Sequence, residues 1–194
     1  MKELHTLNQL RFARSEFQRG FKGVSDEDSR RRFMPINSIA WLIGHLEWHE
    51  HHYWLKCAQG IFTFSRLDEV AAFGKPPADV SLKEMSDLWH AVIKASEEYL
   101  INLSKDDMVK HLVVNGKEIS ANIGTMIMRV TYHYFYHIGE MQAIRQLLGH
   151  KDLPSYIGNG IETVGEFYWD EQISKNWTIY SNLETRKPLS RKYS

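Results

Sequence analysis

Two histidines, His133 and His137, stand one helical turn apart in a segment that otherwise carries Met, Val, Ile and Leu. Side chains four residues apart share a face of an α-helix, so both rings are expected to point the same way. A buried imidazole without a partner is costly to desolvate, so something must satisfy both rings. Two interpretations are open. Either the rings bond to Tyr, Glu or backbone inside the core, or one helix supplies two nitrogens to a metal ion.

A projection of this helix at about 100° per residue places both histidines in the middle of an apolar stripe. The stripe consists of Met126, Val130, Met141, Ile144 and Leu148. The residues at its sides are Tyr134, Ile138, Gln142 and Arg145. We therefore expect both rings to face the core.

A further candidate ligand occurs earlier in the chain, in the stretch NSIAWLIGHLEWHEHHYW. His45 directly follows Gly44 there, and glycine inside a helix costs roughly 1 kcal/mol relative to alanine. We expect this glycine to allow close approach of a neighbouring helix. His49, one turn further on, could lie in the core or at its rim. His51 and His52 are expected at the surface near the helix end, where a partly positive ring suits the helix dipole.

These stretches resemble the DinB-like (YfiT-like) superfamily. The matching segments are GHLEWHE, HYFYHIGEMQAIRQLLG and LPSYIG, and the resemblance spans roughly residues 5–160. It implies a four-helix bundle with crossover connections and a divalent metal bound by three histidines. The resemblance places those ligands at His45, His133 and His137.

Glu140 departs from the pattern, because many relatives carry Gln or Asp at this position. It lies three residues after His137, on the same side of the helix. Its carboxylate could be a fourth ligand, an acceptor for a ring N–H or a general base. The alternative is a structural ion pair with Arg129 or another basic neighbour.

Three neutral imidazoles leave a divalent metal at least one open position, which is typical of catalytic sites. Such a metal lowers the pKa of bound water to about 7, or holds a thiolate or carbonyl for attack. Imidazole suits Zn, Ni, Fe and Cu alike, so the metal stays open. Members of the resembled family include transferases and isomerases that use low-molecular-weight thiols.

We therefore expect a metal-dependent hydrolase or thiol transferase that acts on a small electrophilic molecule, with a low-molecular-weight thiol as a possible cofactor. The alternative is a non-catalytic metal- or ligand-binding stress-response module. The two differ at the mouth of the site. Four aromatic residues could either line an open mouth or seal it: Trp41, Trp48, Tyr132 and Tyr136.

The composition excludes several other classes. Lys+Arg and Asp+Glu both total 24 in 194 residues, which argues against nucleic acid as a partner. No stretch approaches the ~18 apolar residues needed to cross a bilayer, and the N-terminus lacks the apolar run of a signal peptide. One cysteine, Cys57, excludes an internal disulfide and fits a reducing compartment. A cytoplasmic protein without a membrane partner is expected.

Four long helical patterns must position these residues. They cover roughly residues 3–20, 37–60, 81–103 and 120–149, with Asn37 or Ser38, Ser81, and Ser120 or Ala121 at their starts. Connections of about 16 to 20 residues exceed the usual 2 to 8 of simple bundles and suggest crossovers. Asn115-Gly116 between short apolar runs predicts a type I′ hairpin in the third connection.

We expect a single all-α domain over residues 1–194, with an irregular extension from about residue 150 and a short C-terminal helix near 166–177. Trp41, Trp48 and Trp54 on one helix form more aromatic surface than one bundle face buries easily. Together with the resemblance, this predicts a homodimer.

Overall fold

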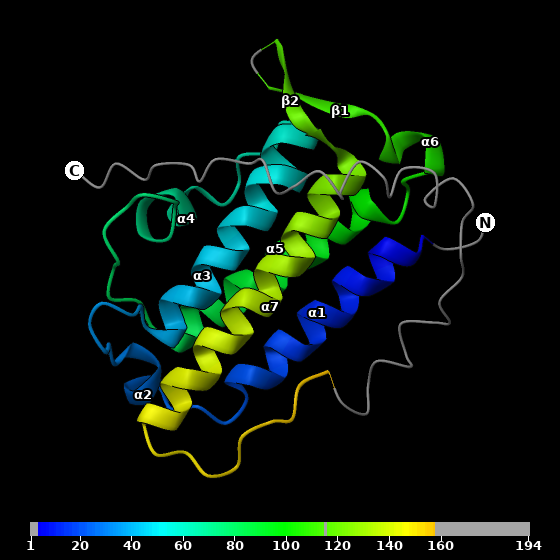
Figure 1. Cartoon of the computed structure of the whole chain (residues 1–194). Coiled ribbons are helices and arrows are strands. Elements are labelled where there is room, and N and C mark those ends of the chain that lie inside the picture. Colours follow the sequence, from blue (N-terminus) through cyan, green and yellow to red (C-terminus); the bar gives the residue numbers. More distant parts are fainter. Residues whose placement is uncertain (1–3, 115, 158–194) are drawn as a thin grey trace, which may run out of the picture. The chain divides into compact units, whose positions relative to one another are not determined.

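The computed structural model describes residues 4–114 and 116–157, all within a compact unit that spans Met1–Val164. The expected all-α bundle is confirmed (Figure 1). Its long helices are α1 (His5–Phe21), α3 (Ile39–Glu50), α5 (Leu82–Leu100) and α7 (Ile123–Leu147). None of the described helices combines the length and apolar character needed to span a membrane.

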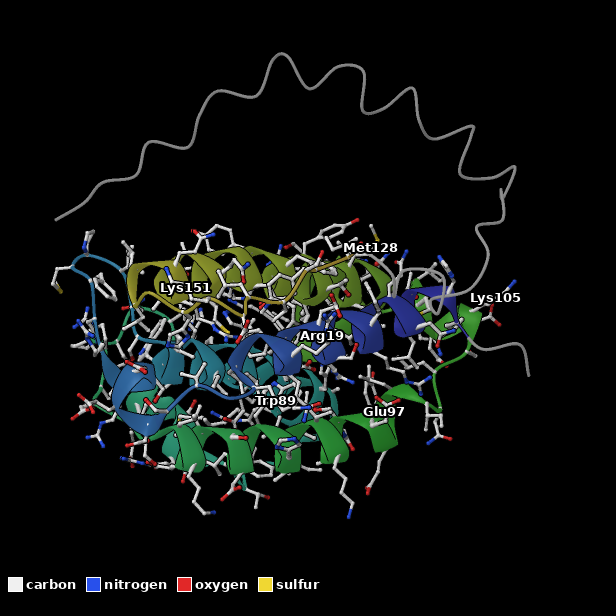
Figure 2. The ribbon with its side chains drawn as sticks, turned by 90° about the horizontal axis from the view of Figure 1, so that it is seen from below. Arg19, Trp89, Glu97, Lys105, Met128 and Lys151 are labelled. Carbon is white, nitrogen blue, oxygen red and sulfur yellow. The ribbon has the colours of Figure 1, made fainter. Side chains whose placement is uncertain are left out.

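Among the long helices, α1 packs on α7, α7 on α3, and α3 on α5 (Figure 1). Helices α3 and α5 run parallel, so their connection is a crossover, whereas α3 and α7 run antiparallel. Trp89 of α5 points into the bundle, where its ring lies 6.3 Å from that of Phe17 on α1 (Figure 2). Gly44 meets α5 as predicted, because a Cβ there would lie 2.6 Å from the sulfur of Met85.

The long connections are not irregular, because each contains short secondary structure. They hold α2 (Asp26–Arg30), α4 (Ser65–Val70), α6 (Lys105–Met108) and the strands β1 (His111–Val114) and β2 (Lys117–Asn122). The strands pair antiparallel, with Val114 opposite Lys117, so the predicted hairpin is present. Gly116 has a φ of 75°, but Asn115 and the expected C-terminal helix lie outside the described residues.

The helix ends follow local capping chemistry. The side chains of Ser38, Ser81 and Asn122 each accept a backbone N–H in the first turn of the helix that follows. The predicted start of α7 at Ser120 or Ala121 is wrong, because both residues belong to β2 and Asn122 is the cap. Gly149 ends this helix with a φ of 82°, as expected of a C′ glycine.

The second predicted helix does not continue as one α-helix to residue 60. After Glu50 the chain forms a π-helical segment, η1 (His51–Cys57), whose wider turn changes the direction of the following side chains. His51 is fully buried against Phe64, so the prediction of a surface position is wrong, and His52 is half-buried.

The tryptophans of this region pack within a single chain. Trp54 is fully buried, Trp41 is 7% exposed, and the half-buried Trp48 donates its indole N–H to Asp68. Their surface therefore gives no support to the predicted homodimer, which stays a prediction.

Glu47 is a buried carboxyl that the sequence did not single out. It is fully buried on α3, and neither of its oxygens has a hydrogen-bond partner among the described residues. Burial, and secondarily the charge of Glu84, raise the pKa of Glu47 to about 9. The carboxyl is therefore protonated in the folded protein at neutral pH but ionised in the unfolded chain.

This difference predicts a pH-dependent stability. Below the pKa of Glu47 in the unfolded chain, near 4.5, the carboxyl is protonated in both states and does not lower the stability. As pH rises from there to about 9, the free energy of unfolding falls. Glu47→Gln should remove this slope, at most about 1.4 kcal/mol per pH unit. Urea unfolding at pH 6 and pH 8 measures it, with the exposed Glu118→Gln as control. An equal effect of Glu47→Gln at both pH values would contradict the prediction.

Candidate metal centre

Four histidine rings meet where α3 and α7 cross. His45 and His49 come from α3, and His133 and His137 come from α7. The ring centroids of His49 and His133 are 4.4 Å apart, and those of His45 and His137 are 5.4 Å apart. One ring nitrogen from each of His45, His49 and His133 lies within 4.8 Å of the others. The Nε2 atoms of His133 and His137 are 2.9 Å apart.

The histidines lie at the edge of the core face of α7 and not in its middle. The stripe residues Met126, Val130, Met141 and Ile144 are buried as expected, but so are Tyr134, Ile138 and Arg145, which the projection placed at the side. The reason is that α7 contacts both α1 and α3, so its buried face is wider than one stripe. His137 is 6% exposed and His133 half-buried, so both face α3.

Hydrogen bonds orient two of the four rings. His45 donates its Nδ1–H to the carbonyl oxygen of Ala71 at 3.0 Å, and His137 donates its Nδ1–H to Oε2 of Glu140 at 2.8 Å. These acceptors assign the proton to Nδ1, so Nε2 of each ring carries the lone pair, and that of His137 accepts the Nε2–H of His133 at 2.9 Å. An outer partner that fixes the ring in this way is the usual companion of a histidine that binds metal.

Three of the four rings, those of His45, His49 and His133, are uncharged at neutral pH. Burial lowers the pKa of His45 to about 4 and that of His133 to about 3, and in His133 the neighbouring rings of His137 and His45 add to the effect. Burial and the adjacent His133 lower the pKa of His49 to about 2. Neutral imidazole is the form that binds metal, so this donor set fits a borderline divalent ion such as Zn, Ni or Fe.

His49 is the ring whose position the sequence left open between core and rim. It is half-buried, and its centroid lies 4.8 Å from that of His45 and 5.8 Å from that of Tyr53. Among the described residues, no hydrogen bond holds either of its ring nitrogens. It belongs to the cluster, but nothing fixes its tautomer.

Glu140 contacts the cluster through the ring of His137. Within the described part of the chain, Arg129 is exposed and forms no ion pair with it. The geometry matches the second of the expected roles, an acceptor for a ring N–H.

Aromatic side chains surround the cluster unevenly. Trp41 stacks on His45 with centroids 4.6 Å apart, and it is itself buried. Tyr136 lies 5.0 Å from His137, but it is 70% exposed, and Tyr132 is 63% exposed. Trp41 therefore covers one side, while the side with the half-buried His49 of α3 and His133 of α7 is not sealed.

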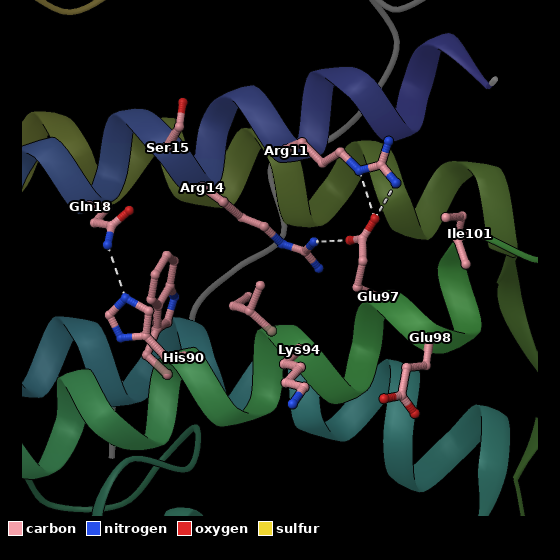
Figure 3. A pocket seen from close by; sticks show the side chains of 11 residues that line it. Arg11, Arg14, Ser15, Gln18, His90, Lys94, Glu97, Glu98 and Ile101 are labelled. Atoms are coloured by element: carbon pink, nitrogen blue, oxygen red, sulfur yellow. Dashed lines mark hydrogen bonds and ion pairs between the residues drawn. The ribbon is translucent and has the colours of Figure 1, made fainter.

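A groove of about 730 Å³ lies elsewhere, between α1 and α5 (Figure 3). No histidine of the cluster lines it. Glu97 binds both Arg11 and Arg14 there, and Gln18 bonds to His90 at 2.9 Å. Because these charged groups bind each other and the groove holds no cluster of ligand atoms, we assign the chemistry to the histidines.

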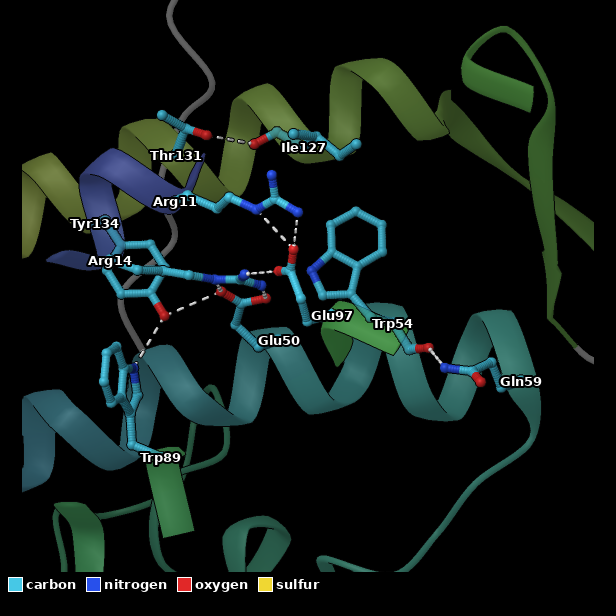
Figure 4. Close-up of polar contacts among 10 residues, drawn as sticks. All are labelled: Arg11, Arg14, Glu50, Trp54, Gln59, Trp89, Glu97, Ile127, Thr131 and Tyr134. Atoms are coloured by element: carbon cyan, nitrogen blue, oxygen red, sulfur yellow. Dashed lines mark hydrogen bonds and ion pairs between the residues drawn. The ribbon is translucent and has the colours of Figure 1, made fainter. Parts of the chain in front are cut away.

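A buried polar network lies behind the histidines and was missed from the sequence. It links Arg14, Glu50, Trp89 and Tyr134 (Figure 4). A usable signal was the spacing of Leu7, Leu10, Arg14 and Phe17, which puts an arginine on an apolar stripe. Burial and the charge of Glu50 raise the pKa of Tyr134 well above its ordinary value, so its hydroxyl stays protonated and can donate.

Comparison with known proteins adds one match. A family model described as mycothiol S-transferase matches residues 6–149. No curated protein matches the chain.

Proposed function

Because the chain belongs to the mycothiol S-transferase family, a part of the DinB/YfiT-like metal-binding superfamily, we propose that it is a metal-dependent transferase. It joins a low-molecular-weight thiol of the mycothiol class to a small electrophilic molecule. The observation behind the proposal is the cluster of four imidazoles, in which His45 and His137 carry their protons on Nδ1 and so offer Nε2 as the donor atom. The reaction belongs in the cytoplasm, where such a thiol is kept reduced.

The proposed metal ligands are His45, His133 and His137. The Nδ1 atoms of His45 and His137 are already engaged by Ala71 and Glu140, which leaves Nε2 for the metal. Nε2 of His133 faces that of His137 at 2.9 Å and completes the set. His49 then lies beside the open position, where incoming reactants meet the site.

A divalent metal held there supplies Lewis-acid chemistry that lowers the pKa of a thiol at the open position. Three residues of the chain shape the site. The Ala71 carbonyl orients the ring of His45, Glu140 orients that of His137, and Trp41 excludes water from one side. In the transfer, the sulfur–carbon bond forms as the bond to the leaving group breaks. The thiol proton is released, and the leaving group departs with the bonding electron pair.

A substrate screen tests the function. Metal-loaded protein is incubated with activated aryl halides, epoxides and activated esters, with and without mycothiol, cysteine or glutathione. We expect conversion that requires a thiol and consumes it in equal amount. Ester cleavage that needs no thiol would indicate the hydrolase instead, and no conversion at all would favour the non-catalytic module.

His49 separates the enzyme from that module. If His49 were a fourth ligand, the metal would be closed off, as in structural sites. Under the proposal, His49→Ala keeps the metal and changes only the reaction with the thiol. Loss of metal from His49→Ala would support a closed site.

Glu140→Gln is expected to weaken metal binding about tenfold, the lower end of the range for residues that orient a ligand. Gln can still accept the His137 N–H, but it lacks the charge that strengthens this bond. Competition with a chromophoric chelator measures the dissociation constant, with Glu118→Gln as control. An unchanged constant together with a 10²- to 10⁴-fold loss of activity would make Glu140 a general base instead.

A further inference from the structure

The buried network of Arg14, Glu50, Tyr134 and Trp89 connects all the long helices (Figure 4). Arg14 donates two hydrogen bonds of 2.8 Å to the carboxylate of Glu50. The hydroxyl of Tyr134 donates to Oε1 of Glu50 at 3.0 Å, and the indole N–H of Trp89 donates to that hydroxyl at 3.0 Å. Glu50 and Tyr134 are fully buried, and Arg14 is 4% exposed.

Two members of the network are the sequence neighbours of clustered histidines. Glu50 follows His49, and Tyr134 follows His133. Consecutive side chains on a helix point about 100° apart, so one residue can turn toward the core while its neighbour faces the adjoining helix. The Glu50–Tyr134 bond therefore crosses from α3 to α7 at the level of the His49–His133 pair.

Apolar packing alone leaves the axial position of one helix against another weakly specified, since side chains of similar size can replace each other. A hydrogen bond between two buried groups has one satisfied geometry, and any slip leaves a buried donor or acceptor unpaired. The Glu50 carboxylate is further held by Arg14 from α1, so the acceptor cannot follow the hydroxyl if α7 shifts.

We propose that Tyr134 and Glu50 are positioning residues of the metal centre: their hydrogen bond sets the register of α3 against α7 and thereby the separation of the histidine nitrogens. The inference rests on the proposed metal site, but it assigns a role to residues that touch neither metal nor substrate.

The test is Tyr134→Phe, which removes one hydroxyl of α7 and keeps the ring packed against Phe17 of α1. Purified variants are loaded with Co(II), and the dissociation constant and the visible spectrum of the bound ion are recorded. We expect the dissociation constant to rise about tenfold, the size found when partners of a ligand are removed. The spectrum should change as well, because it reports the arrangement of the ligands.

Two controls separate positioning from general stability. Thr131→Val removes another buried hydroxyl of α7, one that bonds only to Ile127 of the same helix at 2.9 Å. Leu7→Ala makes a cavity on α1, which carries no clustered histidine. Both should leave the dissociation constant and spectrum unchanged, although Leu7→Ala lowers the melting temperature.

A Tyr134→Phe protein that matches the controls in affinity and spectrum overturns the inference. If this variant does not fold, Trp89→Phe replaces it, since that change removes the bond that orients the hydroxyl while a smaller ring still fills the place of the indole beside Phe17 and Phe21. A smaller rise in the dissociation constant is then expected, and an unchanged value overturns the inference. Wild-type protein that binds no Co(II) refutes the proposed metal site, and with it this role.

Discussion

Replacing His133 or His137 by alanine is expected to reduce bound divalent metal from close to one ion per chain to a small fraction. Each substitution removes one of the proposed ligands and leaves two, which do not hold a metal stably. It also leaves a hole beside the remaining nitrogens, since the two Nε2 atoms are only 2.9 Å apart. Elemental analysis after dialysis against trace metal measures the occupancy.

The matched control is His111→Ala, because His111 is an exposed histidine on β1. The His111→Ala protein should keep its metal. Stoichiometric metal in both the His133 and His137 variants would refute the proposed ligand set. Metal lost from His49→Ala but retained in His137→Ala would transfer the third ligand to His49.

Removal of the metal is expected to lower the melting temperature by roughly 5–10 °C without unfolding the chain. Free metal at a hundred times its dissociation constant stabilises the folded state by about 2.7 kcal/mol. For a chain of this size, one kcal/mol corresponds to roughly 2–4 °C. The fold should survive because most of its core is one large apolar cluster drawn from all four long helices.

Thermal melts followed by circular dichroism, with and without chelator, provide the measurement. The control is the His133→Ala protein, whose melting curve should not respond to chelator. An unchanged wild-type curve after verified metal loss would contradict a stabilising role.

The long helices, two of their N-terminal caps and the hairpin could be predicted because they depend on local sequence patterns. Apolar spacing located the long helices. Asn37 or Ser38 was predicted as one cap, and the spacing of Ser81 to Glu84 indicated another; Ser38 and Ser81 are the caps. The Asn-Gly pair indicated the hairpin. The switch from α- to π-helix at His51 was not predictable, since a wider turn has no residue signature, and it carried His51 from the expected surface into the core.

The sequence predicted histidines that lie near one another, whereas the choice of ligands among them stays a prediction, because the nitrogens within 4.8 Å of one another belong to His45, His49 and His133. The i, i+4 spacing of His133 and His137 and the resemblance at His45 brought together residues that meet in the structure. The acceptor for His45 could not be foreseen, because the Ala71 carbonyl lies 26 residues away in a connection without a strong pattern. Whether His49 lies in the core or at its rim depends on the relative rotation of α3 and α7, and this rotation is decided by tertiary packing.

We propose that one metal ion, held by His45, His133 and His137, enables transfer of a thiol to an electrophile. The most direct test is to titrate metal-free protein with Zn(II) or Ni(II) while the initial rate of thiol consumption is recorded. We expect a rate near background without metal, a linear rise, and a break at one ion per chain that is absent in His137→Ala. A full rate without metal, or no thiol transfer at saturating metal with any electrophile tested, would contradict it.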